Sequence, residues 1–224
     1  MIGLLDAHND NYEKIASLTR PGKLRYCRRH GYQFVEHVFG DLDRTPHWGR
    51  ILAIQEHLPK FEWLLYLDSD TIITNPEVKI EPHIDPRYDV TVGRMPKWLT
   101  GKASHLSTSA MLIKNTEWVL NFLPKWWEQR QFINAPYHAD PEHDRGATLG
   151  GGGMWFEQSA YQFLYDTDDD CYNHTRLMPD SWFNHRKANH DDSCFLIHVT
   201  TNERGYQDKL DRMKEKLRSM ICFL

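Results

Sequence analysis

Two aspartates stand one residue apart at the end of an apolar run. The run, residues 63–67, has the length, the aromatic content and the lack of polar alternation of a strand buried on both faces. Ligands of open α/β sheets bind just outside the carboxyl ends of such strands. Asp68 and Asp70 follow this strand directly, and paired carboxylates suit Mn²⁺ or Mg²⁺ bound to a diphosphate. An isolated Asp-x-Asp is ordinarily a solvated turn, so the strand before it is what favours a metal site.

A histidine ends a second apolar strand in the same way. Residues 194–199 form this strand, and His198 follows three apolar side chains within it. Two carboxylates and an imidazole can hold Mn²⁺ while leaving positions open for diphosphate oxygens. The alternative is a histidine whose hydrogen bonds are satisfied at a strand end.

A carboxylate and an amide stand at the start of a predicted helix over 157–165. Glu157 and Gln158 directly follow aromatic residues that include Trp155. Aromatic faces bind sugar rings, while acids and amides bind hydroxyls. The alternative for Glu157 is capping of the helix start. Arg50, on a helix that starts near Pro46, either reaches a phosphate or forms a surface salt bridge.

Two further motifs are assigned no chemistry. The acidic run 166–170 follows a helix and has no buried strand before it, so we expect a solvated turn. The glycines 150–153 lack the Gly-Lys-Ser/Thr continuation of a phosphate loop. We interpret them instead as a flexible lid or as a place where the backbone packs closely.

The elements that must position these residues alternate between strands and helices. We expect strands at 2–5, 32–38, 63–67, 90–93, 107–113, 176–178 and 194–199. Helical spacing is present between residues 12 and 30, with an interruption at Pro21-Gly22, and over 46–58, 116–127, 157–165 and 207–220. Residues 131–153 are predicted to be a long loop. This order predicts an α/β fold with a mostly parallel, doubly wound central sheet.

Composition limits the remaining possibilities. The 224 residues are 40% hydrophobic, which is enough for one domain with its own core. A net charge of -4 argues against a nucleic-acid binder, and no apolar stretch reaches the length of a membrane span. The four cysteines lie far apart, which disfavours a zinc site or a dense disulfide framework. Taken as it stands, the chain is expected to be soluble and cytoplasmic.

Several segments together resemble one family in order and spacing. They are residues 26–32 (YCRRHGY), 47–50 (HWGR), 63–75, 106–118, 156–160 (FEQSA) and 197–198. This pattern resembles glycosyltransferase family 34, a family of retaining enzymes with the GT-A fold that includes galactosyl-, mannosyl- and xylosyltransferases. The resemblance covers nearly the whole chain and implies a single GT-A domain over 1–224. Within it, 1–94 would form the nucleotide-binding half, 95–205 the acceptor-binding half and 206–224 a C-terminal amphipathic helix.

The resemblance also implies roles for individual residues. Asp68, Asp70 and His198 would hold the metal, Mn²⁺ or Mg²⁺, and Glu157 and Gln158 would lie beside the reacting anomeric carbon. The remaining matches are a nucleotide-sugar set, Ala7, Asn9, Tyr12, Arg50, Asp68, Ser69 and Asp70, and an acceptor or sugar set, Trp155, Phe183 and Asn184.

The chain departs from the family pattern in two places. Ser107-Thr108-Ser109 stands where the family usually has Asn-Thr-Gly, and Thr200-Thr201-Asn202 stands where Gly-Cys-Lys often follows the metal histidine. The lysine of that triplet would bind diphosphate, and Arg204 is the replacement that we expect. Relatives usually carry a membrane anchor and a stem, so a trimmed catalytic domain would belong in the Golgi lumen.

The resulting hypothesis is a metal-dependent glycosyltransferase. It would move a sugar from a UDP- or GDP-linked donor to a glycan acceptor with retention of anomeric configuration. The alternatives are an inverting GT-A enzyme that uses Glu157 as a base, a covalent intermediate on Glu157, a sugar nucleotidyltransferase, and a non-catalytic carbohydrate-binding module.

Overall fold

A computed structural model describes residues 1–94, 106–134, 156–179, 195–199 and 205–221. Its strands are β1 (Ile2–His8), β2 (Gln33–Val38), β3 (Trp63–Leu67), β4 (Thr71–Ile73), β5 (Val90–Arg94), β6 (Leu106–Lys114), β7 (Thr175–Met178) and β8 (Leu196–His198). Its α-helices are α1 (Glu13–His30), α2 (Gly49–His57), α4 (Glu117–Trp127), α5 (Phe156–Thr167), α6 (Asp169–His174) and α8 (Gly205–Ile221). Short 3-10 turns, of which Pro46–Trp48 and Leu58–Lys60 flank α2, connect some of these elements.

The central sheet has six strands in the order β2-β1-β3-β6-β5-β7. Strand β1 pairs in parallel with β2 and β3, and β5 pairs in parallel with β7. Strand β6 is antiparallel to both of its neighbours, β3 and β5. The predicted α/β class and mostly parallel sheet are therefore confirmed.

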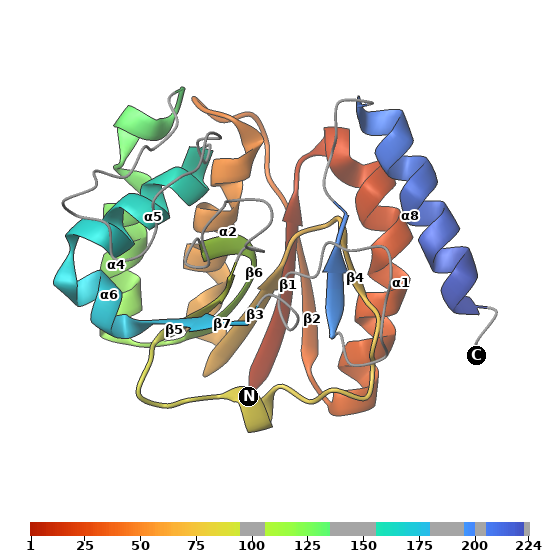
Figure 1. The fold of residues 1–224 in the computed structure, drawn as a ribbon, viewed down its shortest axis with the longest axis horizontal. Helices are drawn as coiled ribbons and strands as arrows, with labels where there is room; N and C mark the ends of the chain where they lie inside the picture. The colour runs from red at the N-terminus through yellow and green to blue at the C-terminus, as the bar shows by residue number, and fades with distance from the viewer. Residues whose placement is uncertain (95–105, 135–155, 180–194, 200–204, 222–224) are drawn as a thin grey trace.

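Helices cover both faces of this sheet (Figure 1). Along β3, Leu64 and Tyr66 belong to the core that contains α2, α4 and α5. Trp63, Leu65 and Leu67 belong to a second core that contains Tyr26 of α1. The uninterrupted apolar run of β3 is thus explained, because both faces of this strand are buried.

Helix α1 runs unbroken through Pro21, so the predicted interruption at Pro21-Gly22 is wrong. Pro21 lies on the exposed side of the helix, whereas Thr19, Lys23 and Tyr26 are buried against the sheet side. Burial of that face outweighs the cost of the missing backbone donor at Pro21. The helix ends where expected, at Gly31 in the left-handed conformation (φ 71°).

The acidic run 166–170 is only partly the solvated turn that we predicted. Asp166 ends up inside α5 and is buried, where Gln162 donates a hydrogen bond to its carboxylate. Asp168 caps the start of α6 by accepting from the backbone of Asp170. The sequence alone missed this because α5 extends beyond its last apolar residue and buries the first acid of the run.

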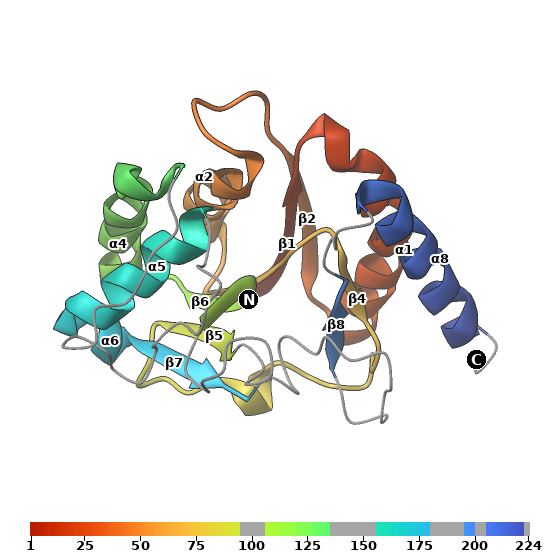
Figure 2. The same cartoon turned by 45° about the horizontal axis from the view of Figure 1, so that its top comes forward.

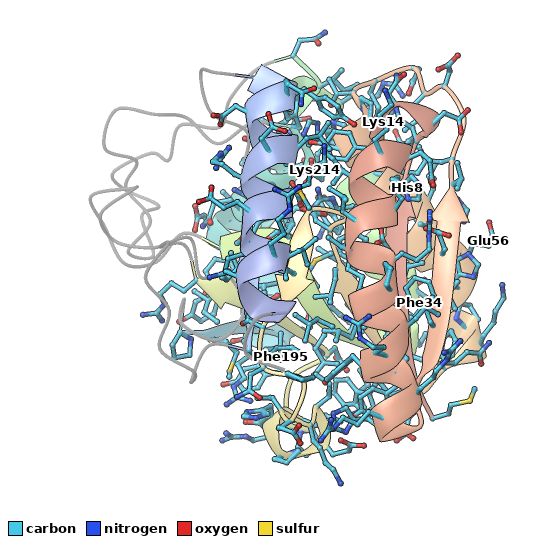
Figure 3. The ribbon with its side chains drawn as sticks, turned by 90° about the vertical axis from the view of Figure 1, so that its right-hand side faces the viewer. His8, Lys14, Phe34, Glu56, Phe195 and Lys214 are labelled. Atoms are coloured by element: carbon cyan, nitrogen blue, oxygen red, sulfur yellow. The ribbon has the colours of Figure 1, made fainter. Side chains whose placement is uncertain are left out.

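A small second sheet and the C-terminal helix complete the fold. Strand β4 pairs antiparallel with β8, and α8 lies beside α1 (Figures 1, 2 and 3). Leu210 and Met213 of α8 pack on Ile72 and Ile197, which come from β4 and β8. Within the described ranges, no helix is both long and apolar enough to cross a membrane.

Candidate active site

A pocket of about 490 Å³ opens at the carboxyl ends of β1 and β3. Its walls come from β1 and the turn after it, the loop between β3 and β4, the middle of β6, the start of α5, β8 and α8. The lining residues are Ala7, His8, Asn9, Asn11, Tyr12, Phe39, Pro46, His47, Arg50, Tyr66, Asp68, Ser69, Asp70, Thr108, Ser109, Phe156, Glu157, Gln158, His198 and Lys209. Ten of the thirteen site residues predicted from the sequence are in this set.

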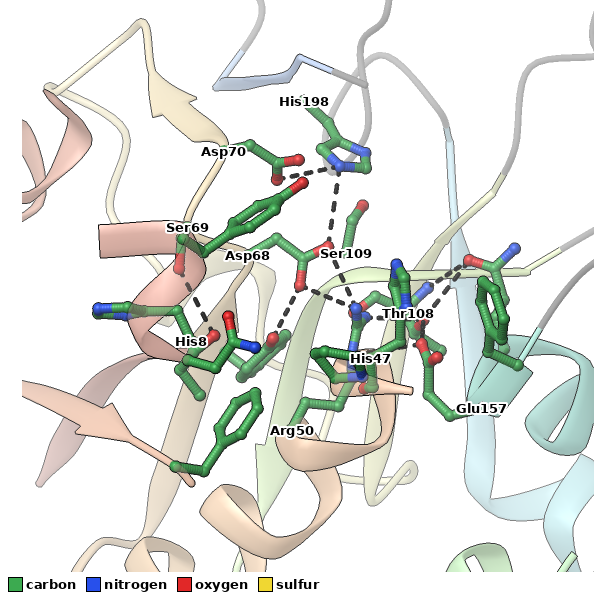
Figure 4. Close-up of a pocket in the computed structure, with 18 of the residues that line it drawn as sticks. His8, His47, Arg50, Asp68, Ser69, Asp70, Thr108, Ser109, Glu157 and His198 are labelled. Carbon is green, nitrogen blue, oxygen red and sulfur yellow. Dashed lines mark hydrogen bonds and ion pairs between the residues drawn. The ribbon is translucent and has the colours of Figure 1, made fainter. Parts of the chain in front are cut away.

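Asp68, Asp70 and His198 converge on one wall of the pocket (Figure 4). Their donor atoms all lie within 4.8 Å of one another. The Nε2 atom of His198 is 3.1 Å from Oδ1 of Asp70 and 3.7 Å from Oδ2 of Asp68. Two carboxylates and an imidazole at this spacing are a plausible ligand set for Mn²⁺ or Mg²⁺.

Strand pairing explains how His198 reaches the aspartates. In the β4–β8 pair, Thr71 stands opposite His198, and the backbone N–H of Val199 donates to the carbonyl of Asp70. Asp70 directly precedes Thr71 in the chain. The register of this short antiparallel pair therefore places the imidazole beside the second carboxylate.

Lys209 is a pocket residue that sequence reasoning missed. It lies on α8 with a side chain only 2% exposed, and its Nζ ion-pairs with Oδ2 of Asp70 and lies 2.9 Å from the hydroxyl of Tyr12. Burial alone would raise the pKa of Asp70, but the charges of His198 and Lys209 outweigh it and hold the pKa below its usual value. The sequence did hold one sign of this position. Lys209 precedes Leu210, an apolar residue of the predicted helix 207–220, and therefore lies near the buried face of that helix.

A buried network lies beneath the loop that carries Asp68 and Asp70. Lys23 of α1 donates to Oδ2 of Asp6 at 2.7 Å and to the carbonyl of Asp68 at 2.8 Å. The hydroxyl of Ser69 donates to Asp6, and Thr19 donates to the carbonyl of Ser69 at 2.7 Å. The Ser69 side chain therefore points away from the two aspartate side chains and anchors the loop.

The opposite wall is built around Arg50. Its guanidinium lies 3.1 Å from Asp68 and 3.3 Å from Glu157, and it donates to both oxygens of Thr108. Thr108 in turn donates its hydroxyl to Glu157 at 3.0 Å and its backbone N–H to Gln158 at 3.2 Å. Arg50 thus forms a buried salt bridge rather than the surface one considered from the sequence. Burial alone would lower the pKa of Arg50, but Asp68 and Glu157 raise it above its usual value.

Two aromatic rings border this wall. Phe156 precedes Glu157 and has a positive φ of 63°. Its ring stacks on that of His47 with 4.5 Å between the centroids and 9° between the planes. A bulky residue is uncommon in the left-handed region, and such strain gathers at binding sites.

The remaining predicted residues fall into two groups. Ala7, Asn9 and Tyr12 line the pocket at the end of β1, where we expect the nucleotide. Trp155, Phe183 and Asn184, and also Arg204, lie outside the described residues. Both cysteines within the described ranges, Cys27 and Cys171, are free and buried.

Comparisons with known proteins agree with this arrangement. The sequence model of the galactosyl transferase GMA12/MNN10 family matches residues 4–88, the part that contains Asp68 and Asp70. A probable glycosyltransferase 3 from Oryza sativa subsp. indica is 30% identical over 131 residues, covering 54% of this chain and 27% of the rice protein. The probable alpha-1,6-mannosyltransferase MNN10 of Saccharomyces cerevisiae is 24% identical over 207 residues, covering 79% of this chain and 49% of the yeast protein.

The chain therefore spans 27% of the length of the rice protein and 49% of the length of the yeast protein. Among solved structures, a glycosyltransferase involved in the glycosylation of the major capsid of PBCV-1 has a TM-score of 0.68 at 21% identity. That match covers 95% of this chain and 98% of the other, so the two share a fold over nearly their whole length. The family model, the relatives and the solved structure support the resemblance to glycosyltransferase family 34, the galactosyl transferase GMA12/MNN10 family, and the chain has the GT-A fold.

Proposed function

We propose that this chain transfers a sugar from a UDP- or GDP-linked donor to a hydroxyl of a glycan acceptor, with a divalent metal, Mn²⁺ or Mg²⁺, and with retention of anomeric configuration. One observation carries the proposal. A carboxylate–carboxylate–imidazole cluster faces Glu157 and Gln158 across a single pocket, which also holds the residues expected to meet the nucleotide.

The residues present fit a bound metal. Within the described part of the chain, the buried Oδ1 atom of Asp70 accepts no hydrogen bond, although it faces His198. The other oxygen, Oδ2, is held by Lys209, so the carboxylate is already oriented with Oδ1 toward His198. When bound, a divalent ion here would neutralise charge that develops on a diphosphate leaving group.

Lys209 and Arg50 supply the positive charge of the protein itself. Lys209 reaches the pocket between Asp70 and Tyr12, where a diphosphate held beside the aspartates would meet its ammonium. Arg204, the diphosphate-binding candidate from the sequence, lies outside the described residues, so that prediction stays open. The guanidinium of Arg50 is engaged by Asp68, Thr108 and Glu157, so it links the two walls of the pocket and fixes their separation.

Glu157 and Gln158 form the wall where the sugar would react. Glu157 is held through Oε1 by Arg50 and Thr108, and Oε1 of Gln158 accepts from the backbone of Thr108. An amide oxygen and a compensated carboxylate held in place in this way can steady positive charge on an oxocarbenium-like sugar. This restraint favours retention through a front-face reaction over the use of Glu157 as a nucleophile or as a mobile base.

The test is nucleotide release from a panel of UDP- and GDP-sugars, with Mn²⁺, with Mg²⁺ and with chelator, alongside thermal shifts for the same panel. We expect release with at least one donor, abolished by chelator, and NMR of the product showing the donor's anomeric configuration. Glycan binding without release from any donor would support the carbohydrate-binding module instead. An inverted product would reject retention while leaving the metal site intact.

A further inference from the structure

A second set of metal-binding side chains lies outside the pocket, on the edge of the central sheet. His37 comes from β2, the first strand in the sheet order, and Glu56 and His57 end α2. The three donor atoms lie within 4.8 Å of one another. Glu56 lies at the outer edge of the molecule, with α1 between it and α8 (Figure 3).

The distances within this set match one bound ion. The Nδ1 atom of His37 is 3.0 Å from Nε2 of His57 and 3.7 Å from a Glu56 oxygen, and His57 Nε2 is 3.5 Å from the other Glu56 oxygen. Ligands at about 2.0–2.1 Å from a tetrahedral zinc ion stand roughly 3.3 Å apart. The two imidazole rings are nearly perpendicular, at 78°, with centroids 5.2 Å apart.

We propose that His37, Glu56 and His57 form a binding site for one transition-metal dication, Zn²⁺. Two imidazoles and one carboxylate favour zinc over the harder Mn²⁺ and Mg²⁺, which prefer oxygen. Three protein ligands leave the fourth position for water. This site is independent of the pocket and of the proposed function.

A further candidate cluster, which includes the pocket residue His8, already has a cation bound between its carboxylates. His8, Glu13 and Glu36 also bring donor atoms together, but the guanidinium of Arg20 bridges the two carboxylates at 2.8 and 2.6 Å. An arginine already supplies the cation at that cluster. No Lys or Arg among the described residues is paired with Glu56 in the structure, so its carboxylate remains available.

Lys60 determines how the zinc site must rearrange. Its ammonium lies 3.0 Å from Nδ1 of His57 and can only donate, so Nδ1 accepts and Nε2 carries the proton that faces His37. Zinc binding through Nε2 moves that proton to Nδ1, with no net change in protonation. Lys60, which is exposed, must then turn away.

The site would join β2 to α2 next to a wall of the pocket. Two residues after His37, Phe39 lines the pocket, and its ring lies 6.4 Å from that of His37. The ring of Phe39 also packs so tightly against Gly49 of α2 that a Cβ there would come within 2.5 Å of it. A zinc ion would therefore fasten the strand and the helix that hold Phe39.

The experiment measures Zn²⁺ binding by calorimetry and Co²⁺ absorption after chelator treatment. A chain carrying Asp70→Asn and Lys209→Met removes the contribution of the pocket. In this background we expect one Zn²⁺ per chain, a rise in Tm of roughly 5 °C at 100-fold excess over Kd, and the visible bands of tetrahedral cobalt.

Variants at the site separate this proposal from adventitious binding. His37→Ala, on the half-exposed edge strand, should abolish the binding event, whereas His83→Ala, a histidine outside the cluster, should leave it intact. Lys60→Glu should tighten binding about tenfold, because a carboxylate would accept the Nδ1 proton of His57. Equal Zn²⁺ affinity in His37→Ala and in the background, or no saturable binding in the background, would overturn the proposal.

Discussion

Two clusters of charge meet the same three-residue loop, residues 68–70, from opposite sides. Beneath the loop, Asp6 and Lys23 are fully buried and bonded to each other, to the hydroxyl of Ser69 and to the carbonyl of Asp68. Above it, Asp70 faces the pocket with one oxygen that accepts no hydrogen bond within the described residues. The lower cluster is closed and the upper one has room for a ligand.

The contrast explains why the spacing Asp-x-Asp suits a metal site. The segment is a tight turn, closed by the backbone N–H of Thr71, which donates to the carbonyl of Asp68 at 2.9 Å. Asp68 and Asp70 share the pocket side, while the hydroxyl of Ser69 bonds Asp6 on the other side. The middle residue can therefore anchor the loop without occupying the space that the ligand needs.

The largest effect should come from breaking the closed cluster. Lys23→Met leaves the Asp6 carboxylate buried without its cation, which should lower the free energy of unfolding by about 3–5 kcal/mol. Urea denaturation at neutral pH measures this change. The double variant Asp6→Leu, Lys23→Met should recover much of the loss, and Lys14→Met on the exposed face of α1 should change little. Equal stability of Lys23→Met and wild type would contradict the role of the pair.

The pocket cluster should respond differently. Asp70→Asn should lower metal-dependent nucleotide release by about 10²–10³-fold, and it also removes the carboxylate that ion-pairs with the buried ammonium of Lys209. Adding Lys209→Met removes that ammonium, so stability should recover while activity does not. Recovery of activity together with stability would show that Asp70 serves only folding.

Lys209→Met alone separates the proposed diphosphate contact from a purely structural role. We expect the donor KM to rise about tenfold, equivalent to about 1.4 kcal/mol, with a smaller change in kcat. Lys214→Met, at an exposed position of the same helix, is the matched control. An unchanged donor KM would assign Lys209 to orienting Asp70 and nothing more.

A milder change tests whether α1 holds the loop. Thr19→Val removes the hydroxyl that donates to the carbonyl of Ser69 and should cost about 1 kcal/mol of stability. Metal affinity should also fall, because the loop would be less tightly held. Ser17→Ala, which removes a hydroxyl bonded to the backbone on the exposed side of α1, should affect neither quantity.

The smallest effect is a dependence of stability on acidic pH. Burial alone would raise the pKa of Asp6, but Lys23 and hydrogen bonds from His8 and Ser69 lower it below 3.8. The folded form therefore favours the ionised carboxylate, and this stabilisation is complete above pH 3.8 and is lost as the pH falls further. The double variant Asp6→Leu, Lys23→Met should show a shallower loss of stability below pH 4. Parallel curves would reject this contribution.

The sequence alone determined much of the architecture and part of the site. Periodicity and chain order predicted the α/β class, and the apolar run ending at Leu67 placed β3 with its observed bounds. Asp68 and Asp70 were predictable because they follow that strand directly. These signals are local, and burial on both faces leaves a clear mark on a short segment.

Only the tertiary structure decided the partners of those residues. His198 meets Asp70 through the register of a three-residue strand pair, and Lys209 enters the pocket through the packing of α8 on β4 and β8. Arg50 joins Asp68 to Glu157, which are far apart along the chain, at positions 68 and 157. Such contacts depend on which elements pack together, because a charged side chain next to an apolar stripe looks the same in sequence whether it faces water or a buried carboxylate.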